Sequence, residues 1–198
     1  MIKFTNNNFE KPYILFREKY YAALKKKQSS IEAISISSYS LANSEVDSRF
    51  VNLKYVDGKR FIFFSNYESP KATAFNSHSQ IAALIYWPSI NVQIKMKAQI
   101  KKTSKEFNQK YFYDRSEKKN ALAISSYQSK QIDSYKEVKA RYNKVLKSED
   151  LKKCPDFWGG FSFIPYYFEF WEGNESRINK REVFNKIDNI WQHSFLQP

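Results

Sequence analysis

Residues 91–101 alternate strictly between apolar and polar side chains, and this pattern constrains the fold more than any other feature of the chain. Side chains of a β-strand point alternately to opposite faces of the sheet, so the pattern predicts a strand with one buried and one hydrated face. The apolar face holds Val92, Ile94, Met96, Ala98 and Ile100, and the polar face holds Gln93, Lys95, Lys97 and Gln99.

Strand patterns recur along the rest of the chain. Segments 48–56 and 60–65 flank the dipeptide Asp57-Gly58, which predicts a hairpin because glycine readily adopts the positive φ of a tight turn. Other β-branched or aromatic segments predict further strands, at 31–40, 81–87, 160–164, 166–171 and 189–195. The segment 81–87 is apolar throughout and is expected to be buried.

Helical spacing occurs in three segments, 9–28, 104–113 and 133–147, and the polar residues 125–130 separate the last two. Consecutive strands with inserted helices, rather than regular βαβ alternation, indicate an α+β chain built on a mainly antiparallel barrel. We expect one domain over residues 1–198, because this length suits a single core.

The charge of the chain says little about its partners. Its net charge is +13, but the 33 cations comprise 26 Lys and 7 Arg, a lysine bias that AT-rich codon usage would also produce. The lysine runs lie apart and are not interleaved with aromatic residues, so we expect no nucleic-acid partner. Neither a signal peptide nor an apolar run of membrane-spanning length is present, so no membrane association and a cytoplasmic location are expected.

Few residues are available for catalysis by the protein alone. The chain has two histidines, four glycines and one cysteine, Cys154, which form no nucleophile motif, phosphate loop or usual metal site, and exclude an intrachain disulfide. An enzyme of this composition would use an organic cofactor. Arginine suits phosphate because its planar fork binds two oxygens, and four of the seven arginines fall in distinctive segments: Arg49, Arg115, Arg177 and Arg181.

Two local patterns have a functional and a structural interpretation. If residues 171–181 are extended, Arg177, Asn179 and Arg181 point to one side, either as a binding face or as a solvated edge. Tyr111 and Arg115 are four residues apart, so on a helix they would lie on the same face. There they would either bind an anion together or form an exposed pair without a function. From pattern alone, Trp158, beside the glycine pair 159–160, and Trp171 fit the core better than a cofactor contact.

Eight stretches stand in the order and spacing of a known flavoprotein family. They are SRFVNLK (48–54), FIFFSNYESPK (61–71), IAALIYWP (81–88), VQIKMKAQI (92–100), KYFYDR (110–115), YQSKQI (127–132), FWGGF (157–161) and FEFWEG (168–173). From about residue 31 to its end, the chain thus resembles the pyridoxamine 5′-phosphate oxidase family. This resemblance implies a split barrel, with an N-terminal helical segment at 1–30 and dimerisation and substrate-side strands at 160–198.

The resemblance also implies an oxidase with FMN at the interface of a homodimer. It would convert pyridoxine or pyridoxamine 5′-phosphate to pyridoxal 5′-phosphate, with O₂ as electron acceptor and H₂O₂ as product, in vitamin B6 salvage. The implied FMN contacts are Arg49, Val51, Lys54, Phe64, Ser65, Lys71, Gln93, Gln128, Ser129, Trp171 and Arg181. The implied substrate contacts are Lys54, Tyr111, Arg115, Lys119, Arg177 and Asn179, the last two in catalytic positions.

The chain departs from the family pattern on the substrate side. Asn179 and Lys180 stand where the family usually has histidine and aspartate, and Lys119 stands where a serine is common. Pro70 and Val92 replace arginines. Two alternatives therefore remain open: a related FMN oxidase with another substrate, as in the phenazine-biosynthetic branch, or a non-catalytic protein that binds FMN or pyridoxal phosphate.

Overall fold

The computed structural model describes residues 1–198, which form nine strands, five α-helices and one short 3₁₀ helix. In chain order the elements are β1 (Lys3–Thr5), α1 (Lys11–Lys25), β2 (Ala33–Ser40), β3 (Glu45–Asp57), β4 (Arg60–Asn66), α2 (Pro70–Ser77), β5 (Gln80–Trp87), η1 (Pro88–Ile90), β6 (Val92–Lys102), α3 (Lys105–Asp114), α4 (Glu117–Ser125), α5 (Tyr135–Ser148), β7 (Trp158–Glu172), β8 (Lys180–Ile187) and β9 (Ile190–Leu196). No helix is both long and apolar enough to cross a membrane.

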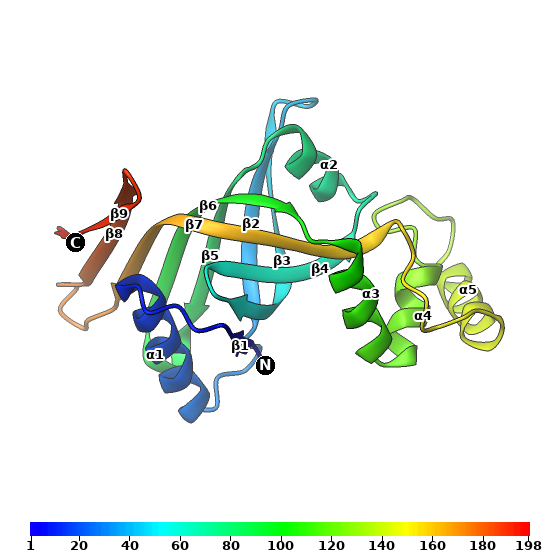
Figure 1. Cartoon of the computed structure of the whole chain (residues 1–198), viewed down its shortest axis with the longest axis horizontal. Helices are drawn as coiled ribbons and strands as arrows, with labels where there is room; N and C mark the ends of the chain where they lie inside the picture. The colour runs from blue at the N-terminus through cyan, green and yellow to red at the C-terminus, as the bar shows by residue number, and fades with distance from the viewer.

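Six strands close into a ring. The order β3-β2-β5-β6-β7 is completed by β4, which pairs with both β3 and β7, and every pairing in the ring is antiparallel. The long strand β7 opens the ring at one side, because residues 158–163 pair with β4 whereas residues 167–172 pair with β8. The hairpin β8–β9 therefore extends away from the barrel, as Figure 1 shows, and the expected α+β split barrel is confirmed.

Local sequence signals explain the main strands. Gly58 has a φ of +58° in the turn between β3 and β4, so the predicted hairpin is confirmed. Strand β6 has the predicted alternation, with residues from Val92 to Ile100 buried at every second position.

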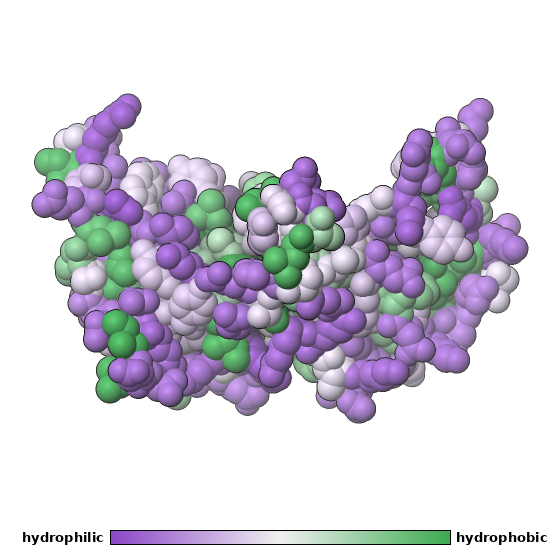
Figure 2. Space-filling view, turned by 90° about the horizontal axis from the view of Figure 1, so that it is seen from above, coloured by the Kyte–Doolittle hydropathy of each residue, from purple (hydrophilic) through white to green (hydrophobic).

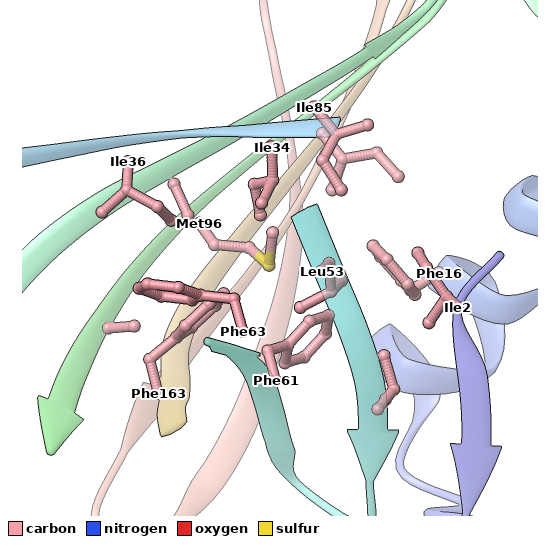
Figure 3. Close-up of a cluster of buried hydrophobic side chains, with 14 of the residues drawn as sticks. Ile2, Phe16, Ile34, Ile36, Leu53, Phe61, Phe63, Ile85, Met96 and Phe163 are labelled. Carbon is pink, nitrogen blue, oxygen red and sulfur yellow. The ribbon is translucent and has the colours of Figure 1, made fainter. Parts of the chain in front are cut away.

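The barrel interior is filled by side chains from strands that lie far apart in the sequence. Figure 3 shows Ile34, Leu53, Phe63, Met96 and Phe163 pointing toward one another, and each is at most 1% exposed. Helix α1 adds a second layer, since the Phe16 ring lies 5.0 Å from that of Phe61 and 5.8 Å from that of Trp87. These aromatic contacts tie the N-terminal helix to the barrel.

Several sequence-based boundaries differ from the structure. Strand β5 is not buried throughout: Ala82, Leu84 and Tyr86 are exposed, because only one face of β5 meets the barrel interior. The two predicted strands on either side of Pro165 are one strand, β7, since a register shift between Lys97 and Ala98 of β6 accommodates the proline. Elements β1, α2, α4, β8 and η1 were not predicted.

Two groups of elements outside the barrel lie at opposite ends of the molecule. Figure 1 shows α3, α4 and α5 at one end and the hairpin β8–β9 at the other. Seen from above, the molecule is hollowed between two raised ends, and hydrophobic residues lie among hydrophilic ones on this face (Figure 2). Residues carried by α4 and by β8 are therefore widely separated within one chain.

Candidate functional site

A cavity of about 760 Å³ lies where β3, β4, α2 and α4 meet. It collects most of the residues that the sequence analysis assigned to FMN or substrate: Arg49, Val51, Lys54, Phe64, Ser65, Lys71, Tyr111, Arg115, Lys119, Gln128 and Ser129. Five predicted residues do not line it: Gln93, Trp171, Arg177, Asn179 and Arg181. The predicted site is thus divided into a cavity and a separate group.

The cavity is strongly cationic. Five cations line it, Arg49, Lys54, Lys71, Arg115 and Lys119, against one acidic residue, Asp47. Such an excess of positive charge in a concave site favours a ligand with more than one anionic group.

One group of cations surrounds the start of α2. Lys71 is only 7% exposed, and its ammonium donates to the Ser69 hydroxyl at 3.1 Å. Burial and the charge of Arg49 lower the pKa of Lys71 to about 8, although the charge of Asp47 opposes this shift. The Arg49 guanidinium is held by the Ser38 hydroxyl at 2.8 Å, the Ile36 carbonyl at 3.2 Å and the Asp47 carboxylate.

A second group of cations comprises Lys54, Arg115 and Lys119. Burial lowers the pKa of Lys54, the charge of Glu32 opposes that shift, and the charges of Lys119 and Arg115 add to it. Arg115 donates to the Lys119 carbonyl at 3.1 Å, which fixes one side of its guanidinium. The Glu32 carboxylate, 3.9 Å from the Lys54 ammonium, offsets part of the repulsion among these three cations, and an anion bound among them would offset more.

An aromatic wall lines the cavity beside the second group. The rings of Phe64 and Tyr111 are stacked, with centroids 3.6 Å apart, and the Trp158 ring lies 5.3 Å from Phe64 in nearly the same orientation. The Arg115 guanidinium lies 4.9 Å from the Trp158 ring centroid. Tyr111 and Arg115 do share the cavity, although α3 ends at Asp114 and Arg115 adopts an extended conformation at the helix C-cap.

Sequence reasoning missed several lining residues: Asp47, Asn66, Leu122, Ala123 and Trp158. Trp158 was assigned to the core, and at 6% exposure it is buried, yet it also lines the cavity. The following glycines reflect close packing behind it, because a Cβ at Gly159 would lie 2.3 Å from the Tyr67 hydroxyl and one at Gly160 2.5 Å from the Thr103 hydroxyl. No local pattern in the sequence marks Trp158 as a lining residue.

The residues absent from the cavity include a row across three strands. Gln93 pairs with Trp171, which pairs with Arg181, so these residues lie side by side on β6, β7 and β8. The Arg181 guanidinium donates to the Glu169 carboxylate at 2.7 and 2.9 Å. This Gln93–Trp171–Arg181 row is half-buried and belongs to the part of the sheet that extends beyond the barrel.

The interpretation of residues 171–181 as extended is wrong for the centre of this segment. Residues 173–179 form a turn in which Arg177 has a φ of +62°, so Arg177, Asn179 and Arg181 do not follow the parity of one strand. The Asn179 side-chain oxygen accepts the backbone N–H of Asn174 at 3.0 Å, and the Arg177 N–H donates to the Asn174 carbonyl at 3.0 Å. Asn174 and Asn179 thus close the turn that carries Arg177.

Comparison with known proteins assigns the chain to a family. Residues 158–198 match the family described as the pyridoxine 5′-phosphate oxidase C-terminal dimerisation region. The pyridoxine/pyridoxamine 5′-phosphate oxidase 1 of Hydrogenovibrio crunogenus is 32% identical over 191 residues, which cover 94% of this chain and 88% of that protein. The corresponding oxidase of Christiangramia forsetii is 33% identical over 192 residues, with the same coverage.

Solved structures share the architecture. PhzG from Burkholderia lata, determined with tetrahydrophenazine-1-carboxylic acid, has a TM-score of 0.89 at 21% identity, covering 94% of this chain and 92% of that chain. A pyridoxamine 5′-phosphate oxidase-related, FMN-binding protein from Nostoc punctiforme has a TM-score of 0.75 at 12% identity, covering 92% and 97%. These two similarities show that the chain shares the fold of both proteins.

Fold and relatives together define the class of protein, an oxidoreductase built on the split barrel of FMN flavoproteins. The chain belongs to the pyridoxine/pyridoxamine 5′-phosphate oxidase family. The cofactor predicted from the sequence, FMN, is confirmed at the level of this family.

Proposed function

We propose that this chain is an FMN-dependent oxidase of pyridoxine and pyridoxamine 5′-phosphate, which forms pyridoxal 5′-phosphate and H₂O₂ with O₂ as electron acceptor. With pyridoxamine 5′-phosphate, the oxidised amine is also hydrolysed by water and leaves as ammonia. One observation carries the proposal: a single cavity holds two groups of cations, Arg49 with Lys71 and Lys54 with Arg115 and Lys119. FMN and a B6 phosphate each carry one phosphate group, so the two groups of cations match the two anions.

The donors of the cavity fit FMN. Arg49, fixed by Ser38 and Asp47, and the buried Lys71 would hold its phosphate, because cations in a partly desolvated site bind phosphate strongly. The amide of Gln128, which lies near Asn66 N–H and the Ser65 hydroxyl at 3.4 and 3.5 Å, would offer polar contacts beside it.

The remaining FMN contacts would come from a second copy of the chain. The Gln93–Trp171–Arg181 row lies outside the cavity, and Trp171 and Arg181 belong to the region that matches a dimerisation family. We infer a homodimer with FMN at its interface, in which each cavity meets the row of the partner subunit. The turn with Arg177 and Asn179 would then face the substrate from the partner side.

Binding and orientation are the main tasks of the residues in this reaction. FMN, when bound, would supply the redox chemistry, as an acceptor for the hydride of the substrate C4′ and a donor of electrons to O₂. Lys54, Arg115 and Lys119 would hold the substrate phosphate, while the wall of Phe64, Tyr111 and Trp158 keeps water from that side of the cavity. The scarcity of histidine suits a mechanism that relies on positioning the substrate rather than on a dedicated acid or base.

The first test is the identity of the bound flavin. The purified protein is expected to be yellow and to release FMN, not FAD, on denaturation, which chromatography of the released flavin would establish. A colourless protein that cannot be reconstituted with FMN would exclude every flavin-dependent function for this chain.

FMN affinity is expected to fall as the pH rises above about 8. Lys71 binds an anion only when protonated, and in the FMN-free protein its pKa is lowered to about 8. Above that pH, binding must take up a proton, so the dissociation constant should rise by up to about tenfold per pH unit. Fluorescence titration with FMN between about pH 7 and pH 10 measures this, and Lys71→Arg, which stays charged, should flatten the profile. An unchanged slope in Lys71→Arg would assign the effect to another group.

A second candidate function is the oxidation of a different substrate. The observation that favours it is Asn179, which replaces a histidine of the family pattern and uses its side-chain oxygen to close the Arg177 turn. If this departure limits B6 turnover, Asn179→His should raise kcat for both B6 phosphates by about tenfold, because a histidine can carry a proton. Asn179→Asp, which keeps the acceptor for Asn174 N–H, is the matched control. Unchanged or lower kcat in Asn179→His would show that Asn179 is not the limiting departure.

A further inference from the structure

A buried carboxylate beside the Gln93–Trp171–Arg181 row has no role in the function proposed above. Glu169, on β7, is 3% exposed and receives four donor atoms. Its Oε1 accepts Arg181 Nε at 2.9 Å and Arg181 Nη2 at 2.7 Å, and its Oε2 accepts Lys95 Nζ at 2.5 Å and the Tyr167 hydroxyl at 3.0 Å. Each oxygen therefore has a separate set of partners.

The contacts of Glu169 fix the orientation of Arg181. In addition to the two bonds to Oε1, Arg181 Nη1 donates to the Gln197 carbonyl at 3.0 Å. Three of the five guanidinium N–H groups are engaged, and two remain for a ligand. An arginine held on both edges loses little conformational entropy when it binds, so its free N–H groups are preorganised.

The charge of the cluster also favours a fixed cation. Burial alone would raise the pKa of Glu169, but hydrogen bonds from Lys95, Arg181 and Tyr167 outweigh burial and lower it. Glu169 therefore stays ionised, and two cations share one negative charge. Without the carboxylate, Lys95 and Arg181 would repel each other and the guanidinium would lose its anchor.

We propose that Glu169 is a positioning residue of the flavin site, which acts through Arg181. It holds the guanidinium beside Trp171 so that two N–H groups face the flavin brought by the partner cavity. This inference rests on the proposed FMN site, in which Arg181 is a flavin contact, and it assigns a role to a residue that touches neither flavin nor substrate.

The test is FMN affinity measured by fluorescence titration of the full-length, FMN-stripped dimer. Glu169→Gln keeps the shape of the side chain and removes its charge, and we expect the FMN dissociation constant to rise by about tenfold. Tyr167→Phe is the matched control, because it removes a donor from Oε2 and leaves Arg181 on Oε1. Its dissociation constant should stay within about twofold of that of the original protein.

A double-mutant cycle separates positioning from a structural role. Arg181→Met should also weaken FMN binding, and adding Glu169→Gln to it should cause no further loss, because Glu169 acts only through Arg181. Additive losses, or unchanged affinity in Glu169→Gln, would overturn the inference while the FMN site stands. Absence of FMN binding by the unsubstituted protein would overturn the proposed function as well. Thermal melts of the FMN-free variants show which of them are folded, and only folded variants are compared. If Glu169→Gln does not fold, Glu169→Asp replaces it in the cycle with the same expectations.

Discussion

Replacing Arg115 by alanine is expected to raise the KM for pyridoxine 5′-phosphate by roughly 50-fold and to leave FMN bound. Arg115 lines the cavity with Lys54 and Lys119, and its guanidinium is held over the Trp158 ring with one bond to the Lys119 carbonyl. Losing one partner of a charge-assisted phosphate contact costs about 2–3 kcal/mol. Steady-state kinetics on FMN-loaded protein measures the effect.

The chain offers a close control for Arg115. Arg141 on α5 also lies over an aromatic ring, 5.2 Å from the centroid of Tyr127, but it does not line the cavity. Arg141→Ala should therefore leave KM unchanged. Equal effects of the two substitutions would mean that Arg115 acts through general charge and not through contact with the substrate.

Two variants with weakened FMN binding are expected to restore one flavin site when they are combined in a mixed dimer. Arg49→Ala damages the cavity, and Arg181→Met damages the row on β6, β7 and β8. If each site joins the cavity of one protomer to the row of its partner, one of the two sites in the mixed dimer carries both changes and the other carries none. Dimers isolated with two different tags should then bind one FMN per dimer at the original affinity.

The matched control for complementation places both changes in the cavity. In a mixed dimer of Arg49→Ala and Lys71→Met, every site carries one damaged cavity, so no site is restored. FMN stoichiometry from absorbance against protein concentration distinguishes the outcomes. If the mixed dimer of Arg49→Ala and Arg181→Met does not recover FMN binding, the cavity of one protomer and the row of its partner do not form one site.

Strong local signals made most of the barrel predictable. The alternation of β6 and the Asp57-Gly58 turn each reflect a single local cause, the period of a strand or the conformational freedom of glycine, and both predictions are confirmed. The burial pattern of β5 could not be predicted from its sequence, because the residues that face solvent are apolar as well. Side chains of β5 are alternately exposed and buried because only one face of the strand meets the barrel interior.

Helix α4 was missed because its stabilising contacts are distant in sequence. Asn120 is fully buried within it, and its side-chain amide donates to the carbonyls of Phe112 and Leu151 at 2.8 Å. The segment contains good helix formers, but its 9 residues are too few to form a stable helix alone, so tertiary hydrogen bonds decide its structure. This matters for function, since α4 places Lys119 in the cavity.

The resemblance to a family located the cavity residues better than local patterns did. Residues from six helices and strands and from two connecting segments meet there, and no spacing rule connects Arg49 with Gln128. Parity along residues 171–181 gave the wrong geometry for Arg177, because the turn closed by Asn174 and Asn179 interrupts the strand. A sequence pattern assumes regular structure, whereas this turn depends on particular side-chain hydrogen bonds.

Peroxide release from FMN-loaded protein, measured with pyridoxine 5′-phosphate and pyridoxamine 5′-phosphate, tests the proposed oxidase most directly. We expect saturable turnover with one H₂O₂ per pyridoxal 5′-phosphate, and loss of turnover in Arg177→Ala with FMN still bound. A yellow, FMN-loaded protein that forms peroxide with neither B6 phosphate would contradict the assignment.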